Sequence, residues 1–102
     1  MKTYNKLVRD NIPSIIEKDG KRCRIKVLDA EEYKKYAFLK LIEEANEASD
    51  SKTLEELADL EEVVLAAASS IGFTKDDLEK ARLSKKEKNG GFDKKIFLID
   101  VE

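Results

Sequence analysis

The residues of this 102-residue chain best suited to chemistry are two pairs of acids, each pair spaced three apart. Glu44 and Glu47 form one pair, and Glu56 and Asp59 form the other. When successive residues are placed about 100° apart around a helix axis, each pair lies on or at the edge of an apolar stripe. A carboxylate in that position is costly to ionise without a positive partner, and four converging carboxylates repel one another. The spacing therefore predicts a cation held between two helices.

The expected cation is Mg²⁺, with Mn²⁺ as the alternative, because hard divalent ions take carboxylate oxygens and water and leave positions for phosphate. The chain has no histidine and a single cysteine, Cys23. These counts exclude histidine general bases, the common catalytic triads, an internal disulfide and the usual zinc and di-iron ligand sets. The competing interpretation is that some of the 22 acids fall near an apolar stripe by chance. Chance explains one such pair better than two.

The net charge of −2 conceals an uneven distribution of charge along the chain. Residues 1–28 carry 8 basic and 3 acidic groups, residues 29–62 carry 4 and 12, and residues 63–102 carry 8 and 7. Substrate phosphates held at a cation in the acidic block would need fixed positive groups from the basic flanks. The candidate phosphate-binding residues are Lys6, Arg9, Lys85, Lys86 and Lys88. The competing interpretation is that the lysines are solvated and that Arg9 pairs with the adjacent Asp10 to anchor the N-terminal segment.

Helix signals place the four acids on two long helices. Asp29 followed by Glu32, and Thr53 followed by Glu56, match the capping box that begins a helix. Thr74 with Asp77 begins a third long helix, and Pro13 and Gly20 frame a short one over residues 14–19. The three long helices are expected to end near residues 48, 71 and 88, with a turn at 49–52 after the first.

Two segments are expected to be strands, which makes the fold mainly α with a minor β element. Residues 22–27 alternate charged and apolar side chains, and residues 95–101 are rich in β-branched and aromatic ones. We expect a single domain over residues 1–102 in which the three long helices pack as part of a bundle and the terminal segments pair as two strands. So small a chain leaves apolar stripes uncovered, which favours a homodimer or a higher assembly.

The central acids also carry a family resemblance. Residues 43–47 match E-E-x-x-E and residues 56–59 match E-x-x-D, which resembles the metal-binding signature of the MazG-like, all-α nucleoside triphosphate pyrophosphohydrolases. Residues 4–13 and 85–97 resemble the ends of the small house-cleaning branch of that superfamily. The resemblance implies Mg²⁺-dependent hydrolysis of a nucleoside triphosphate between the α and β phosphates. It also implies four metal ligands, Glu44, Glu47, Glu56 and Asp59.

The same resemblance implies that Glu43 and Glu44 are the catalytic residues, with Glu43 orienting water or supporting the ligands. One alternative keeps the superfamily with a phosphoribosyl-ATP type of substrate. The other alternative is a non-catalytic helical module that binds cations or nucleic acid. The acids interleaved among the basic residues of the chain ends argue against a surface that binds nucleic acid. No apolar run approaches the roughly 18 residues of a membrane span, and we expect a cytoplasmic protein that binds neither membrane nor nucleic acid.

Overall fold

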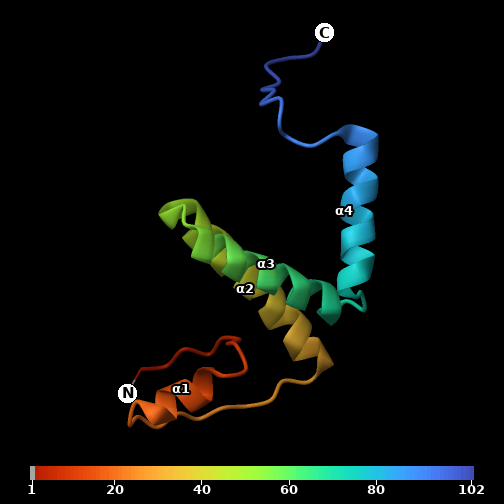
Figure 1. Cartoon of the computed structure of the whole chain (residues 1–102). Coiled ribbons are helices and arrows are strands. Elements are labelled where there is room, and N and C mark those ends of the chain that lie inside the picture. The colour runs from red at the N-terminus through yellow and green to blue at the C-terminus, as the bar shows by residue number, and fades with distance from the viewer. Residues whose placement is uncertain (1) are drawn as a thin grey trace.

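A hairpin of two long helices forms the centre of the computed structural model, which describes residues 2–102 (Figure 1). Helix α2 spans Ala30–Ser51 and helix α3 spans Leu54–Ser70. The chain reverses between them in two residues, and the first of these, Lys52, takes a left-handed conformation with φ of 54°. A short helix α1, Ile12–Lys18, precedes the hairpin, and helix α4, Lys75–Asn89, follows it.

Side-chain caps begin the three long helices where the sequence predicts them. Asp29 and Glu32 form a complete capping box at α2, and Thr74 and Asp77 form another at α4. At α3 the backbone N–H of Glu56 donates to Thr53 Oγ1, but the Glu56 carboxylate does not return to the Thr53 backbone. The reciprocal half of that predicted box is therefore missing, and the Glu56 side chain is free for another use.

The core of the described chain is small. Its buried apolar residues are three alanines, Ala37 and Ala48 of α2 and Ala67 of α3, and no large side chain is fully buried. Alanines at the contact let two helix backbones approach closely but bury little apolar area per residue. Within residues 2–102, helix packing is confined to α2 against α3 and α3 against α4, so α4 leaves the hairpin at an elbow (Figure 1). The all-α class is confirmed, whereas α4 does not complete a bundle within the chain.

The two predicted strands are wrong for the described residues, where the structure contains no strand. Residues 22–27 connect α1 to α2, and residues 95–101 extend beyond α4 at the opposite end of the molecule (Figure 1). Alternating or β-branched side chains favour an extended backbone, but a strand also needs a neighbouring strand to satisfy its N–H and C=O groups. The fold does not bring the two segments together.

Smaller differences concern the helix ends. Residues 49–51, predicted as a turn, continue α2 by nearly one more turn, because the reversal is made at Lys52 instead. Helix α3 ends one residue before the predicted Ile71, and Gly72 follows with φ of 89°. Among residues 2–102, no helix combines the length and the apolar content that crossing a bilayer requires.

Candidate functional site

The acids predicted from spacing meet between α2 and α3. Carboxylate oxygens of Glu43, Glu44 and Glu47 lie within 4.8 Å of one another, and so do oxygens of Glu44, Glu56 and Asp59. Glu44 belongs to both groups and joins them into one cluster, which we call the carboxylate cluster. All four predicted metal ligands and the predicted catalytic Glu43 are therefore brought together by the hairpin.

Glu44 is the buried member of the cluster. Only 7% of its surface is exposed, and it lies on the same stripe of α2 as the buried Ala37 and Ala48. Its Oε1 is 3.4 Å from Lys40 Nζ, whereas its Oε2 is buried and has no hydrogen-bond partner. Burial raises the pKa of the Glu44 carboxyl above its ordinary value, against the opposing effect of the Lys40 hydrogen bond.

Glu56 brings a second unpartnered oxygen from the facing helix. Its backbone is used in the α3 cap, while its Oε2 is buried without a hydrogen-bond partner. In the described part of the chain, this atom and Glu44 Oε2 are the buried side-chain polar atoms that lack a partner. A buried carboxylate oxygen without a donor costs about 1–3 kcal/mol or more, so two of them in one cluster need an explanation.

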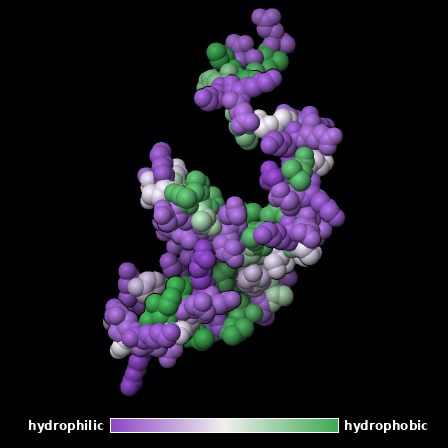
Figure 2. Space-filling view, in the orientation of Figure 1, coloured by the Kyte–Doolittle hydropathy of each residue, from purple (hydrophilic) through white to green (hydrophobic). Residues whose placement is uncertain are grey.

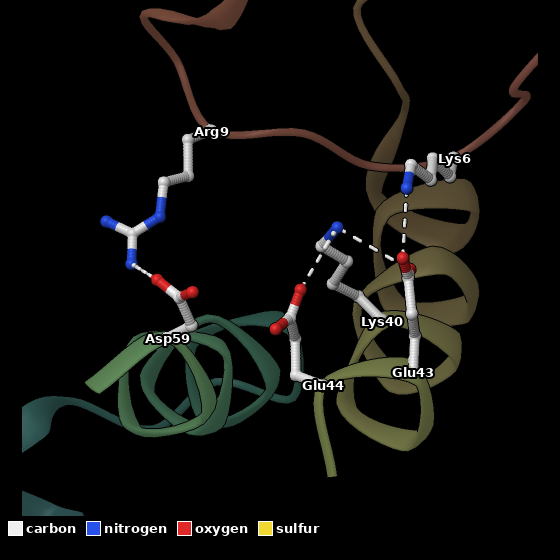
Figure 3. Close-up of polar contacts among 6 residues, drawn as sticks. All are labelled: Lys6, Arg9, Lys40, Glu43, Glu44 and Asp59. Carbon is white, nitrogen blue, oxygen red and sulfur yellow. Dashed lines mark hydrogen bonds and ion pairs between the residues drawn. The ribbon is translucent and has the colours of Figure 1, made fainter. Parts of the chain in front are cut away.

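Two lysines neutralise the α2 side of the cluster (Figure 3). Lys6 Nζ donates to Glu43 Oε1 at 2.9 Å, and Lys40 Nζ lies 3.5 Å from Glu43 Oε2. The hydrogen bond from Lys6 lowers the pKa of the Glu43 carboxyl, and the same bond raises the pKa of the lysine. Glu43 is thus held in its ionised form beside the buried Glu44.

Arg9 neutralises the α3 side. Its Nη2 donates to Asp59 Oδ1 at 2.8 Å, with both side chains about half exposed. Arg9 pairs with this distant acid and not with the adjacent Asp10. The N-terminal arm, which we define as residues 2–11, therefore crosses the cluster with Lys6 attached to α2 and Arg9 attached to α3 (Figure 3).

The remaining predicted phosphate-binding residues lie elsewhere. Lys85, Lys86 and Lys88 are exposed on the second half of α4, which does not pack against α2, and no ion pair joins them to the cluster. Their role stays a prediction. Conversely, Lys40 was not singled out from the sequence, although its position three and four residues before Glu43 and Glu44 is the spacing of helical ion pairs.

No protein-family model matches this chain, and no curated protein or solved structure does either. What points to a function is therefore the geometry and charge of the cluster.

Proposed function

We propose that this protein is a Mg²⁺-dependent nucleoside triphosphate pyrophosphohydrolase, which cleaves its substrate between the α and β phosphates. The observation that carries the proposal is a pair of buried, unpartnered carboxylate oxygens, Glu44 Oε2 and Glu56 Oε2, on two residues of one acidic group between two helices. A divalent cation would supply the partner that such oxygens lack.

The donor set fits a hard cation. Glu44, Glu47, Glu56 and Asp59 would hold it, and all of their side-chain donors are carboxylate oxygens. With Glu43 the cluster has five carboxylates. Three cationic side chains pair with them, namely Lys6, Arg9 and Lys40. When every group is ionised, the cluster carries a charge of −2, which one divalent ion would cancel.

Phosphoanhydride hydrolysis needs charge neutralisation and a positioned water more than it needs a covalent nucleophile. A bound Mg²⁺ would neutralise phosphate charge and lower the pKa of its water ligand. Glu43, kept ionised by Lys6, would orient a water beside the cluster. Lys6 and Arg9 would exchange their carboxylate partners for phosphate oxygens, since both are half exposed and reach the site on a flexible stem.

The test is release of pyrophosphate, as opposed to single phosphates, from a panel of nucleoside triphosphates and a phosphoribosyl-nucleotide substrate in Mg²⁺ or Mn²⁺. We expect Glu44→Gln and Asp59→Asn to reduce turnover by about 100-fold or more, because a metal site supplies several kcal/mol of charge stabilisation. The far-UV circular dichroism of both variants should match that of the wild type.

Glu55→Gln is the matched control, because Glu55 is an exposed acid next to Glu56 that belongs to neither acidic group. It should keep full activity. Absence of pyrophosphate across the panel with either ion, or full activity in Glu44→Gln, would contradict the proposal. Preference for the phosphoribosyl nucleotide would retain the reaction and change the substrate.

A further inference from the structure

Among residues 2–102, Arg9 is the only cation that pairs with an acid of α3. The helix carries five acids, and of these Asp59 alone forms an ion pair, with its Oδ1 at 2.8 Å from Arg9 Nη2. Glu56, one turn earlier, has a buried carboxylate oxygen without a partner. The α3 half of the carboxylate cluster is therefore neutralised by one guanidinium group, which comes from a distant part of the chain.

The N-terminal arm makes few polar contacts with the hairpin. Its hydrogen bonds and ion pairs to α2 and α3 come from Lys6 and Arg9, and in the described part of the chain no backbone hydrogen bond joins residues 2–11 to either helix. Leu7 and Val8, between the two cations, are half-buried. Figure 2 shows hydrophilic surface over much of the region where the N-terminal segments adjoin the hairpin. The Arg9 side chain is thus able to change its partner in contact with water while the arm stays in place.

Two cations of the cluster pair with predicted metal ligands, but they differ in mobility. Lys40 pairs with Glu44 from within α2, four residues earlier, and its side chain is 14% exposed. Arg9 pairs with Asp59 from the arm, and its side chain is 57% exposed. A divalent ion on Asp59 would lie close to the guanidinium group, and like charges at short range repel. Arg9 is therefore the cation that is free to move away.

We propose, on the basis of the proposed function, that Arg9 is an exchangeable counterion, which holds Asp59 in the metal-free protein and passes to a substrate phosphate when the metal site is filled. The exchange couples the two ligands of the site. A divalent ion on Asp59 releases Arg9 for phosphate, and a phosphate that takes Arg9 releases Asp59 for the ion, by the same factor in each direction. The metal alone binds against competition from Arg9, so the site favours the ion and the triphosphate together.

The experiment is isothermal titration of the full chain with Mg²⁺, and separately with Mn²⁺, in the absence of nucleotide. We expect Arg9→Ala to bind the ion about fivefold more tightly than the wild type, or more, because the competitor is removed. Arg9→Lys keeps the positive charge and should stay closer to the wild type. A purely structural role of Arg9 predicts the opposite sign, because a disturbed site binds metal more weakly.

Lys6→Ala is the matched variant. It removes the same charge from the same arm, and Lys6 is less exposed than Arg9, but its partner Glu43 lies outside the four predicted ligands. Competition at Asp59 predicts a smaller gain in metal affinity for Lys6→Ala than for Arg9→Ala. Equal gains would mean that the metal responds only to the net charge of the cluster, and would overturn the inference.

A measurement on the wild type decides the question if Arg9→Ala does not fold. The chain has four arginines, and Arg82 pairs with Glu79 on α4, away from the cluster. Saturation with Mg²⁺ should lower the ¹⁵N heteronuclear NOE of the Arg9 Nε–H group, because the released side chain moves more freely. The same signal of Arg82 should not change.

The outcomes separate this inference from the proposed function. Equal or weaker metal binding by Arg9→Ala, or an Arg9 signal that does not change at saturation, would overturn the inference and leave pyrophosphate release as a separate result. Tighter metal binding by Arg9→Ala, without pyrophosphate release by the wild type, would support Arg9 as the counterion and contradict the enzymatic function. Absence of Mg²⁺ and Mn²⁺ binding in every protein would overturn both.

Discussion

At Glu44, burial and charge act against one another. The residue is nine-tenths buried, one carboxylate oxygen faces Lys40 at 3.4 Å, and the other has no partner. Lys40 is itself shared with Glu43, so a single ammonium group serves two acids. Without a divalent ion the cluster keeps an excess of negative charge. The raised pKa of Glu44 has burial as its largest cause, which Lys40 opposes and Glu47 reinforces.

The raised pKa of Glu44 makes the stability of the protein depend on pH in a direction that can be measured. The pKa of Glu44 is raised in the folded state above the 4.5 of an ordinary glutamate, so between these two values the folded chain binds more protons than the unfolded chain. The stability that Glu44 contributes is full below about pH 4.5 and is lost as the pH rises through its folded pKa. In the variant Glu44→Gln this loss is absent.

We therefore expect the free energy of unfolding of Glu44→Gln, minus that of the wild type, to increase as the pH rises above 4.5 and then to level off. Urea denaturation without divalent cations and at one protein concentration measures both curves. Titrations that are not coupled to Glu44, such as that of Asp77 in the α4 cap, cancel in the difference. Parallel curves up to about pH 8 would show that ionisation of Glu44 does not lower the free energy of unfolding.

At the scale of elements, two ion pairs join the N-terminal arm to the two helices of the hairpin. Lys6 reaches α2 and Arg9 reaches α3, and α1 packs against neither. The Arg9–Asp59 pair is about half exposed, so it contributes on the order of 0.2–1 kcal/mol to stability. An ion pair of this strength can exchange its carboxylate for a phosphate oxygen at little cost.

Replacement of the arm cations separates their structural role from their proposed role in substrate binding. We expect Lys6→Ala and Arg9→Ala to lower the free energy of unfolding by less than about 1 kcal/mol. Under the proposed function, each should raise KM for the triphosphate about tenfold or more, because a charge-assisted bond to phosphate is lost.

Lys2→Ala is the control for this comparison, since Lys2 lies over the ring of Tyr4 and has no ion pair with the cluster. It should leave KM unchanged. Equal losses of stability and activity in the Arg9 variant, with KM unaltered, would assign the arm a purely structural role.

At the scale of the whole molecule, the hairpin brings together carboxylates that repel one another. The described chain buries three alanines and Glu44, so little apolar area opposes the repulsion within the cluster. A cation that bridges α2 and α3 would stabilise the fold as well as the site.

Mg²⁺ should therefore raise the stability of the protein in the absence of nucleotide. A ligand that binds only the folded state stabilises it by about 2.7 kcal/mol at 100 times its Kd. We expect a corresponding increase in Tm by differential scanning calorimetry that Na⁺ at equal ionic strength does not reproduce, and that chelation reverses. Glu56→Gln should abolish the increase and Glu55→Gln should retain it. A Tm that is indifferent to Mg²⁺ and Mn²⁺ would remove the support for a metal site.

What the sequence alone determined is local in character. The caps at Asp29, Thr53 and Thr74 lie within three residues of the groups that they bond, and each acid lies on its helix face because of spacings of three and four. The helices and the membership of the carboxylate cluster were therefore predictable to within a few residues.

Only the tertiary structure decided what depends on distant partners. Residues 22–27 and 95–101 have the side chains that are typical of strands. They lie next to no strand, so they form no β-ladder hydrogen bonds. Arg9 pairs with Asp59, fifty residues away, and not with the adjacent Asp10. Helix α4 packs against α3 but not against α2, so its lysines lie away from the carboxylate cluster. The physical reason is that spacing specifies which face of a helix a residue occupies, whereas the packing of that face against another segment depends on the fold as a whole.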